Sequence, residues 1–109
     1  MKTVAQLPAP VLTQAHRDAI AYIQELAITI SQQGTYAVNA EYSGQIHEFS
    51  VHVLLFSEIE QRNFKALTSK NVHLPGRCPW MGADALKELL ALTHVLEGLL
   101  FPPTGDDAA

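Results

Sequence analysis

Cysteine and charge are both scarce in this sequence. Cys78 is the only cysteine among 109 residues, and charged residues make up 17% of the chain. One cysteine cannot form a disulfide within the chain, so an oxidising compartment would give it no covalent stabilisation, and we expect a cytoplasmic protein. Apolar residues, at 48%, are too abundant for a disordered chain. The composition therefore predicts a single folded domain.

Long apolar runs are also missing. A helix that spans a membrane needs about 18 consecutive apolar residues, and the longest candidate here, LLALTHVLEGLLF, is interrupted by His94 and Glu97. The N-terminal stretch MKTVAQLPAPVLTQ lacks the continuous apolar region of a signal peptide. We therefore expect neither a membrane segment nor an export signal.

Basic residues are few, and the formal net charge is −4. Binding to phosphate backbones depends on clustered Lys and Arg, so this acidity argues against a nucleic acid partner. Four of the seven basic residues nevertheless fall in one segment, and no acidic residue occurs between Glu60 and Asp84. These four are Arg62, Lys65, Lys70 and Arg77. Such a run is either a solvated surface or a surface for an anionic partner. A dimer would double this basic surface, so nucleic-acid binding by a dimer is a weaker alternative function.

Recognisable catalytic patterns are absent as well. The sequence has no Gly-rich phosphate loop, nucleophile elbow or dinucleotide fingerprint. Its histidines are His16, His47, His52, His73 and His94. His47 and His52 differ by an odd number on an expected strand and so face opposite sides, and no two histidines are three or four residues apart. We expect no metal and no cofactor, and a non-enzymatic role is favoured.

The local patterns predict one domain over residues 11–101, between a flexible N-terminal arm at 1–10 and a flexible acidic tail at 102–109. Thr13 is a suitable N-cap and Gly34 a suitable residue just after a helix, so they bracket an amphipathic first helix. Its apolar face consists of Ala19, Ile20, Ile23, Ala27 and Ile30.

Residues 35–56 predict an antiparallel β-hairpin. A two-residue loop at Ser43 and Gly44 would pair Val38 with Phe49 and Tyr36 with Val51. Alternation then gives one apolar face and one polar face. The apolar face is Tyr36, Val38, Ala40, Phe49, Val51, Val53 and Leu55, and the polar face is Thr35, Asn39, Glu41, Glu48, Ser50 and His52.

A two-stranded hairpin alone is marginally stable in water. Either the next segment supplies a third strand, or two chains pair edge to edge through the strand that ends in VHVLLF. We favour the second arrangement, a homodimer. In the next segment, Ser57 and Glu60 form a capping-box pattern that predicts a short helix, with a strand at 64–67 as the alternative.

Residues 69–79 are expected to form a loop. The last predicted element is a long helix that begins at Cys78 or Asp84 and buries a face of leucines. The fold class is therefore α+β, with the first and last helices packed on one face of the sheet. Double-stranded-RNA-binding domains are among the small folds with a similar order of elements. This sequence lacks their clear third strand and their basic second helix, so we assign no family.

The stretch HLPGRCPWMG contains the only chemistry that suggests an enzyme. Proline is favoured at the first position of a helix, so Cys78 before Pro79 could lie at a helix N-terminus, where a thiolate is stabilised. His73 could then serve as its base. The other interpretation is a buried thiol that packs beside Trp80, since cysteine is among the most buried residue types. A thiol-dependent enzyme or redox sensor is therefore an alternative function.

The same region also suggests a binding surface, because Trp and Arg are enriched at energetically dominant positions of interfaces. The predicted contact residues are Arg62, Phe64, Lys65, Lys70, Arg77 and Trp80. Trp80 could instead cover the end of the core, which we favour, although one role does not exclude the other. The sequence thus predicts a small accessory or regulatory module that binds another protein, with an acidic surface as the suitable partner.

Overall fold

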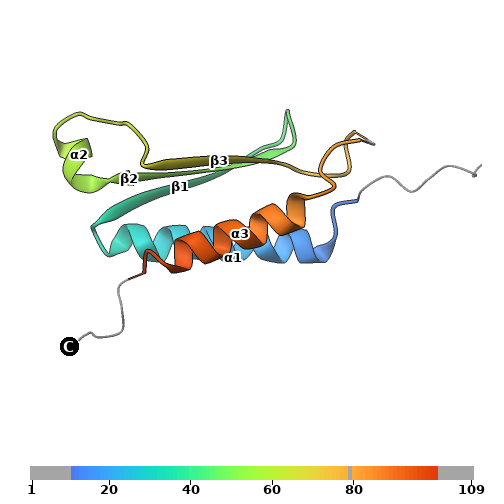
Figure 1. Cartoon of the computed structure of the whole chain (residues 1–109), viewed down its shortest axis with the longest axis horizontal. Coiled ribbons are helices and arrows are strands. Elements are labelled where there is room, and N and C mark those ends of the chain that lie inside the picture. The colour runs from blue at the N-terminus through green and yellow to red at the C-terminus, as the bar shows by residue number, and fades with distance from the viewer. Residues whose placement is uncertain (1–10, 79, 101–109) are drawn as a thin grey trace, which may run out of the picture.

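The computed structural model describes residues 11–78 and 80–100. Its elements are α1 (Gln14–Gln32), β1 (Tyr36–Ser43), β2 (Glu48–Leu55), α2 (Phe56–Glu60), β3 (Thr68–His73) and α3 (Ala85–Glu97). The strands form an antiparallel sheet in the order β1-β2-β3, and α1 and α3 lie side by side on one of its faces (Figure 1). The predicted α+β fold, with both long helices on one sheet face, is confirmed. The predicted arm and tail lie outside the described residues.

The first helix begins where the sequence predicted. The Thr13 hydroxyl accepts a hydrogen bond from the His16 backbone at 3.4 Å, and His16 Nδ1 accepts one from the Thr13 backbone N–H at 3.0 Å. This is a capping box in which a histidine ring replaces the usual glutamate. Gly34 follows the C-cap Gln33 with a φ of +90°, a conformation that favours glycine.

The hairpin forms, but its predicted register is wrong. Tyr36 pairs with Leu55 and Val38 pairs with Val53, which stands four positions after the predicted partner Phe49. The turn covers four residues, 44–47, and His47 adopts the left-handed conformation with a φ of 52°. A shift by an even number leaves every side chain on its predicted face. The longer pairing uses all eight residues of each strand, which a two-residue loop would not allow.

A third strand is present, but at Thr68–His73 instead of 64–67, in a stretch that we expected to be a loop. Val72 is its single buried residue, so the strand has no alternating apolar pattern by which to predict it. It pairs with β2, which makes the strand carrying VHVLLF the central one. The apolar edge on which the homodimer prediction rested is therefore absent, and the oligomeric state stays a prediction.

The starts of the two later helices differ in detail from the prediction. The short helix α2 is confirmed, but its N-cap is Leu55 and no side chain caps it, so Ser57 lies inside the helix. Asp84 is the N-cap of α3, and the alternative start at Cys78 is wrong.

The core lies between the two long helices and the sheet. Its largest fully buried side chains come from α1, α3 and the sheet, and they include Ile23, Ile30, Phe49, Leu89 and Leu96. Among the helices of the described residues, none is both long and apolar enough to cross a membrane.

Candidate functional site

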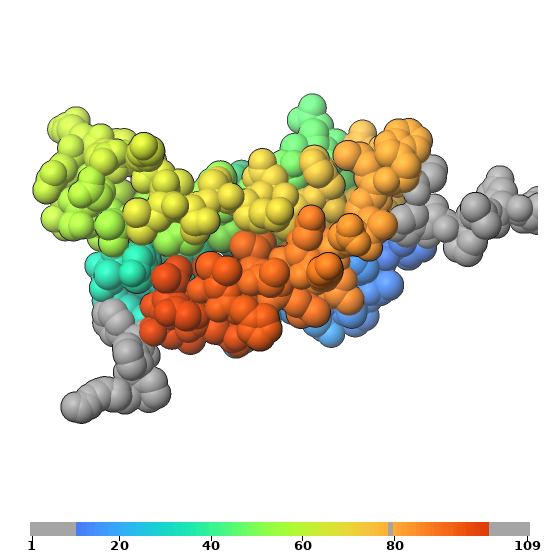
Figure 2. Space-filling model, viewed as in Figure 1, coloured from blue at the N-terminus to red at the C-terminus, as the bar shows by residue number. Residues whose placement is uncertain are grey.

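The predicted contact residues lie along one side of the molecule. Arg62, Phe64 and Lys65 are in the connection between α2 and β3, Lys70 is within β3, and Arg77 and Trp80 are in the loop before α3. The six residues of β3 separate the two ends by about 20 Å. Figure 2 shows this stretch, from yellow-green to orange, running across the upper side of the molecule. The residues therefore form a line and not a compact patch.

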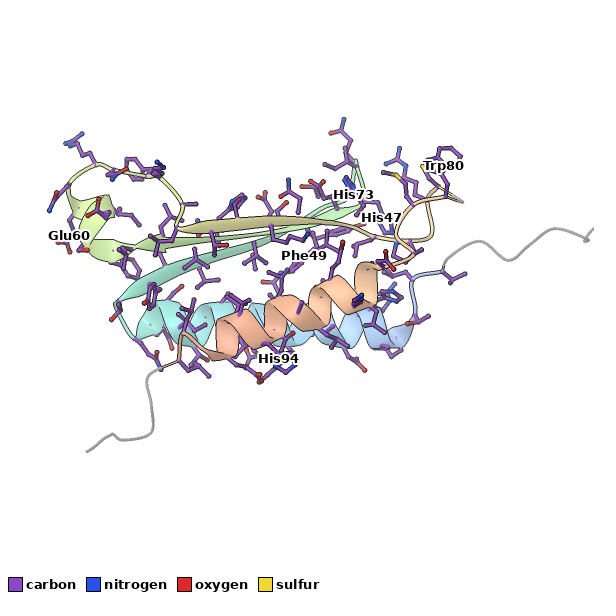
Figure 3. The ribbon with its side chains drawn as sticks, viewed as in Figure 1. His47, Phe49, Glu60, His73, Trp80 and His94 are labelled. Carbon is purple, nitrogen blue, oxygen red and sulfur yellow. The ribbon has the colours of Figure 1, made fainter. Side chains whose placement is uncertain are left out.

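Trp80 is the most exposed large apolar side chain of the described residues, at 79%. It lies near one tip of the molecule (Figure 3). The interpretation in which Trp80 covers the end of the core is therefore wrong. Phe64, 66% exposed, and Leu67, 56% exposed, lie before β3, toward the opposite tip.

The loop that carries Trp80 is fastened to the turn between β1 and β2. His47 Nε2 lies 2.9 Å from the carbonyl oxygen of Pro75. A carbonyl can only accept, so Nε2 carries the hydrogen, and in the neutral ring Nδ1 accepts from the Tyr42 hydroxyl at 2.9 Å. The guanidinium of Arg77 also donates to the carbonyl of Gln45. These contacts hold turn and loop together as one unit.

A glycine allows the same loop to fold back on itself. Gly82 has a φ of +84°, and a Cβ placed there would lie 2.3 Å from the backbone nitrogen of Pro75. No side chain fits so close to a backbone atom, so this contact requires glycine. The sequence contained no signal for it beyond the glycine itself.

The structure removes the premise of the thiol site. Cys78 is half-buried in the loop and α3 begins only at Ala85, so the thiol does not lie at a helix N-terminus. The Nδ1 atom of His73 lies 3.4 Å from a carboxylate oxygen of Glu48, on the adjacent strand. No hydrogen bond joins His73 to Cys78 within the described part of the chain, so the proposed base and nucleophile are not brought together.

The sheet face opposite the helices carries the polar side chains predicted for it, together with the buried Leu54. The third strand extends it with residues that sequence reasoning placed in a loop. Ser69 Oγ and His52 Nδ1 form an exposed cross-strand hydrogen bond of 2.5 Å. Such pairs stabilise neighbouring strands. Among the described residues, no group of three or more His, Cys, Asp or Glu side chains is placed to hold a metal ion.

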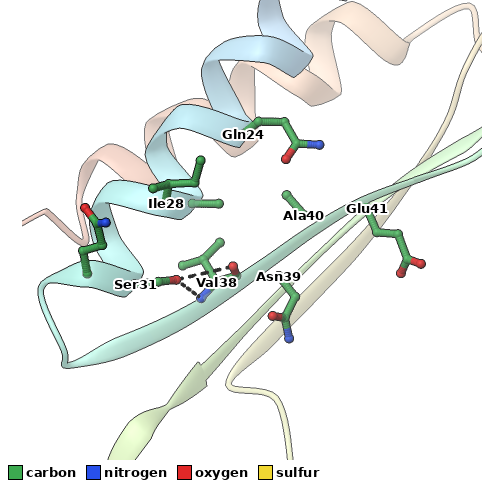
Figure 4. A pocket seen from close by; sticks show the side chains of 9 residues that line it. Gln24, Ile28, Ser31, Val38, Asn39, Ala40 and Glu41 are labelled. Carbon is green, nitrogen blue, oxygen red and sulfur yellow. Dashed lines mark hydrogen bonds between the residues drawn. The ribbon is translucent and has the colours of Figure 1, made fainter.

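Grooves border both edges of the sheet. Figure 4 shows the groove of about 660 Å³ between α1 and β1, whose lining includes Gln24, Ile28 and Ser31. A smaller groove of about 260 Å³ separates β3 from α3. Its lining is Thr68, Ser69, Lys70, Glu88, Ala91, Leu92 and Val95. A further hollow of about 370 Å³ lies between α1 and the end of β1, beside Arg17 and Tyr42.

The basic second helix of double-stranded-RNA-binding domains has no counterpart in the described residues, because α3 is not basic. It contains one lysine, Lys87, against the acidic Glu88 and Glu97. Comparisons with protein-family models, with curated proteins and with solved structures found no match for this chain.

Proposed function

We propose that this protein is a small non-enzymatic accessory or regulatory module that binds another protein through its 62–80 segment. The observation that carries this proposal is the exposure of Trp80, at 79%, on a loop fastened by the His47–Pro75 hydrogen bond. Aromatic side chains of this size contribute strongly when a partner buries them. A loop already held in place loses less conformational entropy on binding than a flexible one.

The charge of the segment supports an acidic partner surface. Four of the seven Lys and Arg residues of the chain lie in this segment, which contains no acidic residue, although the formal net charge is −4. Opposite charges across an interface accelerate association and exclude partners of the wrong sign. The single cysteine fits a cytoplasmic location, which we include in the proposal.

The test is capture from a lysate of the source cell, with the tagged full chain as bait and identification of the captured molecules by mass spectrometry. Two variants carry changes in the 62–80 segment. One is Trp80→Ala, and the other changes Arg62, Lys65, Lys70 and Arg77 together to glutamine. The matched control is Tyr22→Ala, which removes an exposed aromatic side chain from α1.

The proposal expects a defined protein that both segment variants lose and that Tyr22→Ala retains. Equal recovery with all three variants would contradict it. Recovery of nucleic acid, with log affinity falling steeply and linearly against log salt, would instead indicate a phosphate-binding surface. Cys78→Ser is expected to capture the partner as the unmodified chain does. Loss of capture would indicate that the Cys78 thiol is needed for function.

A further inference from the structure

The β3 strand forms one edge of the sheet, and the register shows where its backbone groups point. In an antiparallel ladder, the N–H and C=O groups of successive residues point alternately to opposite sides. The Val38 N–H donates to Ser31 Oγ at 2.9 Å, so the backbone groups of Val38 point away from β2 and those of Asn39 point toward it. The partner of Asn39 on β2 is His52, whose backbone groups therefore point toward β1. The backbone groups of the two neighbours of His52 along β2 must point toward β3.

Those neighbours determine the orientation of β3. Val51 is the register partner of Lys70, so the backbone groups of Lys70 pair with β2. By alternation, the N–H and C=O groups of the residues between the paired ones point outward from the sheet. These residues are Ser69, Asn71 and His73. Within residues 11–78 and 80–100, no strand or helix forms backbone hydrogen bonds with these outward groups.

The two edges of the sheet differ in how they are protected. On β1, the Ser31 hydroxyl accepts from the Val38 N–H and donates to the Val38 carbonyl at 3.5 Å, so it covers part of that edge (Figure 4). The outward backbone groups of β3 have no such side-chain cover among the described residues. The β1 edge is therefore covered in part, whereas the β3 edge is open to a further strand along its length.

The groove beside β3 provides room for the side chains of such a strand. Ala91 and Val95 of α3 form an apolar wall, and Val95 is 50% exposed. On the strand side, Lys70 Nζ lies 3.9 Å from a carboxylate oxygen of Glu88, and both side chains are partly exposed. An edge strand beside a helix is a known geometry for recognising extended peptides, in which main-chain pairing gives affinity and alternate side chains enter the groove.

The linear arrangement of the predicted contact residues suits an extended polypeptide segment as the ligand. Phe64 and Leu67 precede β3 and Trp80 follows it, so apolar side chains are available near both ends of the strand. The basic residues are distributed along the same line, with Lys70 between Lys65 and Arg77. A compact partner surface would contact one tip, whereas an extended acidic segment would contact the whole line.

We propose that β3 binds an extended acidic segment of a partner protein by strand addition, with alternate apolar side chains of that segment in the groove between β3 and α3. This inference rests on the proposed function and specifies the form of the partner. Charge favours an acidic segment over a second copy of this chain. A symmetric pairing of β3 with itself would bring together two copies of a segment that contains four basic residues and no acidic one, and like charges repel.

The first experiment selects peptides from a phage-displayed random library on the immobilised full chain. Selected peptides are expected to alternate apolar and acidic residues. Backbone amide exchange is then measured with one synthetic selected peptide. The amides of Ser69, Asn71 and His73 are expected to exchange rapidly in the free protein and to become protected on binding, whereas the amides of Lys70 and Val72 are already paired with β2. Failure to select peptides, or binding without this protection, would overturn the proposal.

Two pairs of variants test the edge and the groove separately. Asn71→Pro removes an outward N–H without touching the ladder to β2, and Ala40→Pro does the same on the β1 edge. Asn71→Pro should raise the Kd of the selected peptide about fivefold or more, the effect of one lost hydrogen bond, and Ala40→Pro should not. In the groove, Val95→Glu should weaken binding, whereas Leu90→Glu, on the same helix and 49% exposed, should not.

The outcomes separate this inference from the function on which it rests. Folding of each variant is checked by circular dichroism, and if Asn71→Pro does not fold, the Val95 and Leu90 pair decides. If lysate capture of the partner survives Val95→Glu but is lost in Trp80→Ala, the binding function stands and strand addition is wrong. A concentration-dependent dimer that Val95→Glu abolishes, measured by analytical ultracentrifugation, would identify a second copy as the occupant and would also overturn the proposal.

Discussion

His47 Nε2 donates a hydrogen bond to the carbonyl oxygen of Pro75, 2.9 Å away and 28 positions later in the chain. It joins the β1–β2 turn to the loop that presents Trp80. A second backbone contact, from the Leu74 N–H to the His47 carbonyl at 3.0 Å, continues the same connection. The position of the exposed tryptophan therefore depends on a turn whose residues are distant in sequence.

Changing His47→Asn should loosen this connection. Asparagine tolerates the left-handed backbone of position 47, so the change removes the imidazole contacts with little added backbone strain. We expect the free energy of unfolding to fall by about 1 kcal/mol, measured by urea denaturation. His94→Asn, at a side chain 84% exposed, is the control and should change stability by less than about 0.5 kcal/mol. Equal effects of the two changes would contradict a fastening role for His47.

The hydrogen bond between the Tyr22 hydroxyl and Glu97, 2.6 Å long, predicts a pH effect. This hydrogen bond to Glu97, with smaller contributions from desolvation and the carboxylate charge, raises the pKa of Tyr22 above its ordinary value of 10.0. A raised pKa in the folded state favours the protonated phenol. The contribution of the pair to stability is therefore complete below pH 10.0 and is lost as the pH rises through the folded-state pKa.

An ultraviolet titration of tyrosine absorbance measures this shift, with Tyr22→Phe to identify the signal of Tyr22. Glu97→Gln removes the charge and should lower the pKa of Tyr22 toward its ordinary value. An unchanged titration of Tyr22 in Glu97→Gln would show that the pair does not persist in solution.

The same substitution is expected to have a large effect at one phenylalanine and a small effect at another. Phe49 is fully buried between the sheet and the helices, whereas Phe64 is 66% exposed. We expect Phe49→Ala to lower the free energy of unfolding by about 3–5 kcal/mol, because it leaves a cavity in the core. Phe64→Ala should cost less than about 0.5 kcal/mol. Denaturant unfolding of both variants tests this, and a large effect at Phe64 would mean that its side chain packs in solution.

Gly34 and Gly82 both have a positive φ, and the same substitution at each allows a similar comparison. Alanine at Gly34 meets no atom within 4 Å, so its cost is the backbone strain of about 1 kcal/mol. Alanine at Gly82 carries the same strain and also places Cβ 2.3 Å from the Pro75 nitrogen. We expect Gly82→Ala to cost about 1–3 kcal/mol more than Gly34→Ala in thermal unfolding. Similar costs would show that the loop is not packed against itself.

The first helix was predictable because its signals are local. The cap at Thr13, the glycine at position 34 and the apolar spacing all act within a few residues, and the structure places the helix between them. The strand faces were also predictable, because alternation survives any even shift of register. For the contact residues, the sequence did not determine exposure, since we favoured a core position for Trp80 and its side chain is 79% exposed.

What the sequence determined by itself was therefore the α+β class, the first helix and the two faces of the hairpin. Tertiary structure alone decided the hairpin register, the position of β3 and the exposure of Trp80. β3 has a single buried residue, so its existence depends on the hydrogen-bonding edge that β2 offers and not on its own pattern. The loop with Trp80 is placed by the distant His47, and contacts between residues far apart in the chain leave no periodic signal in a single sequence.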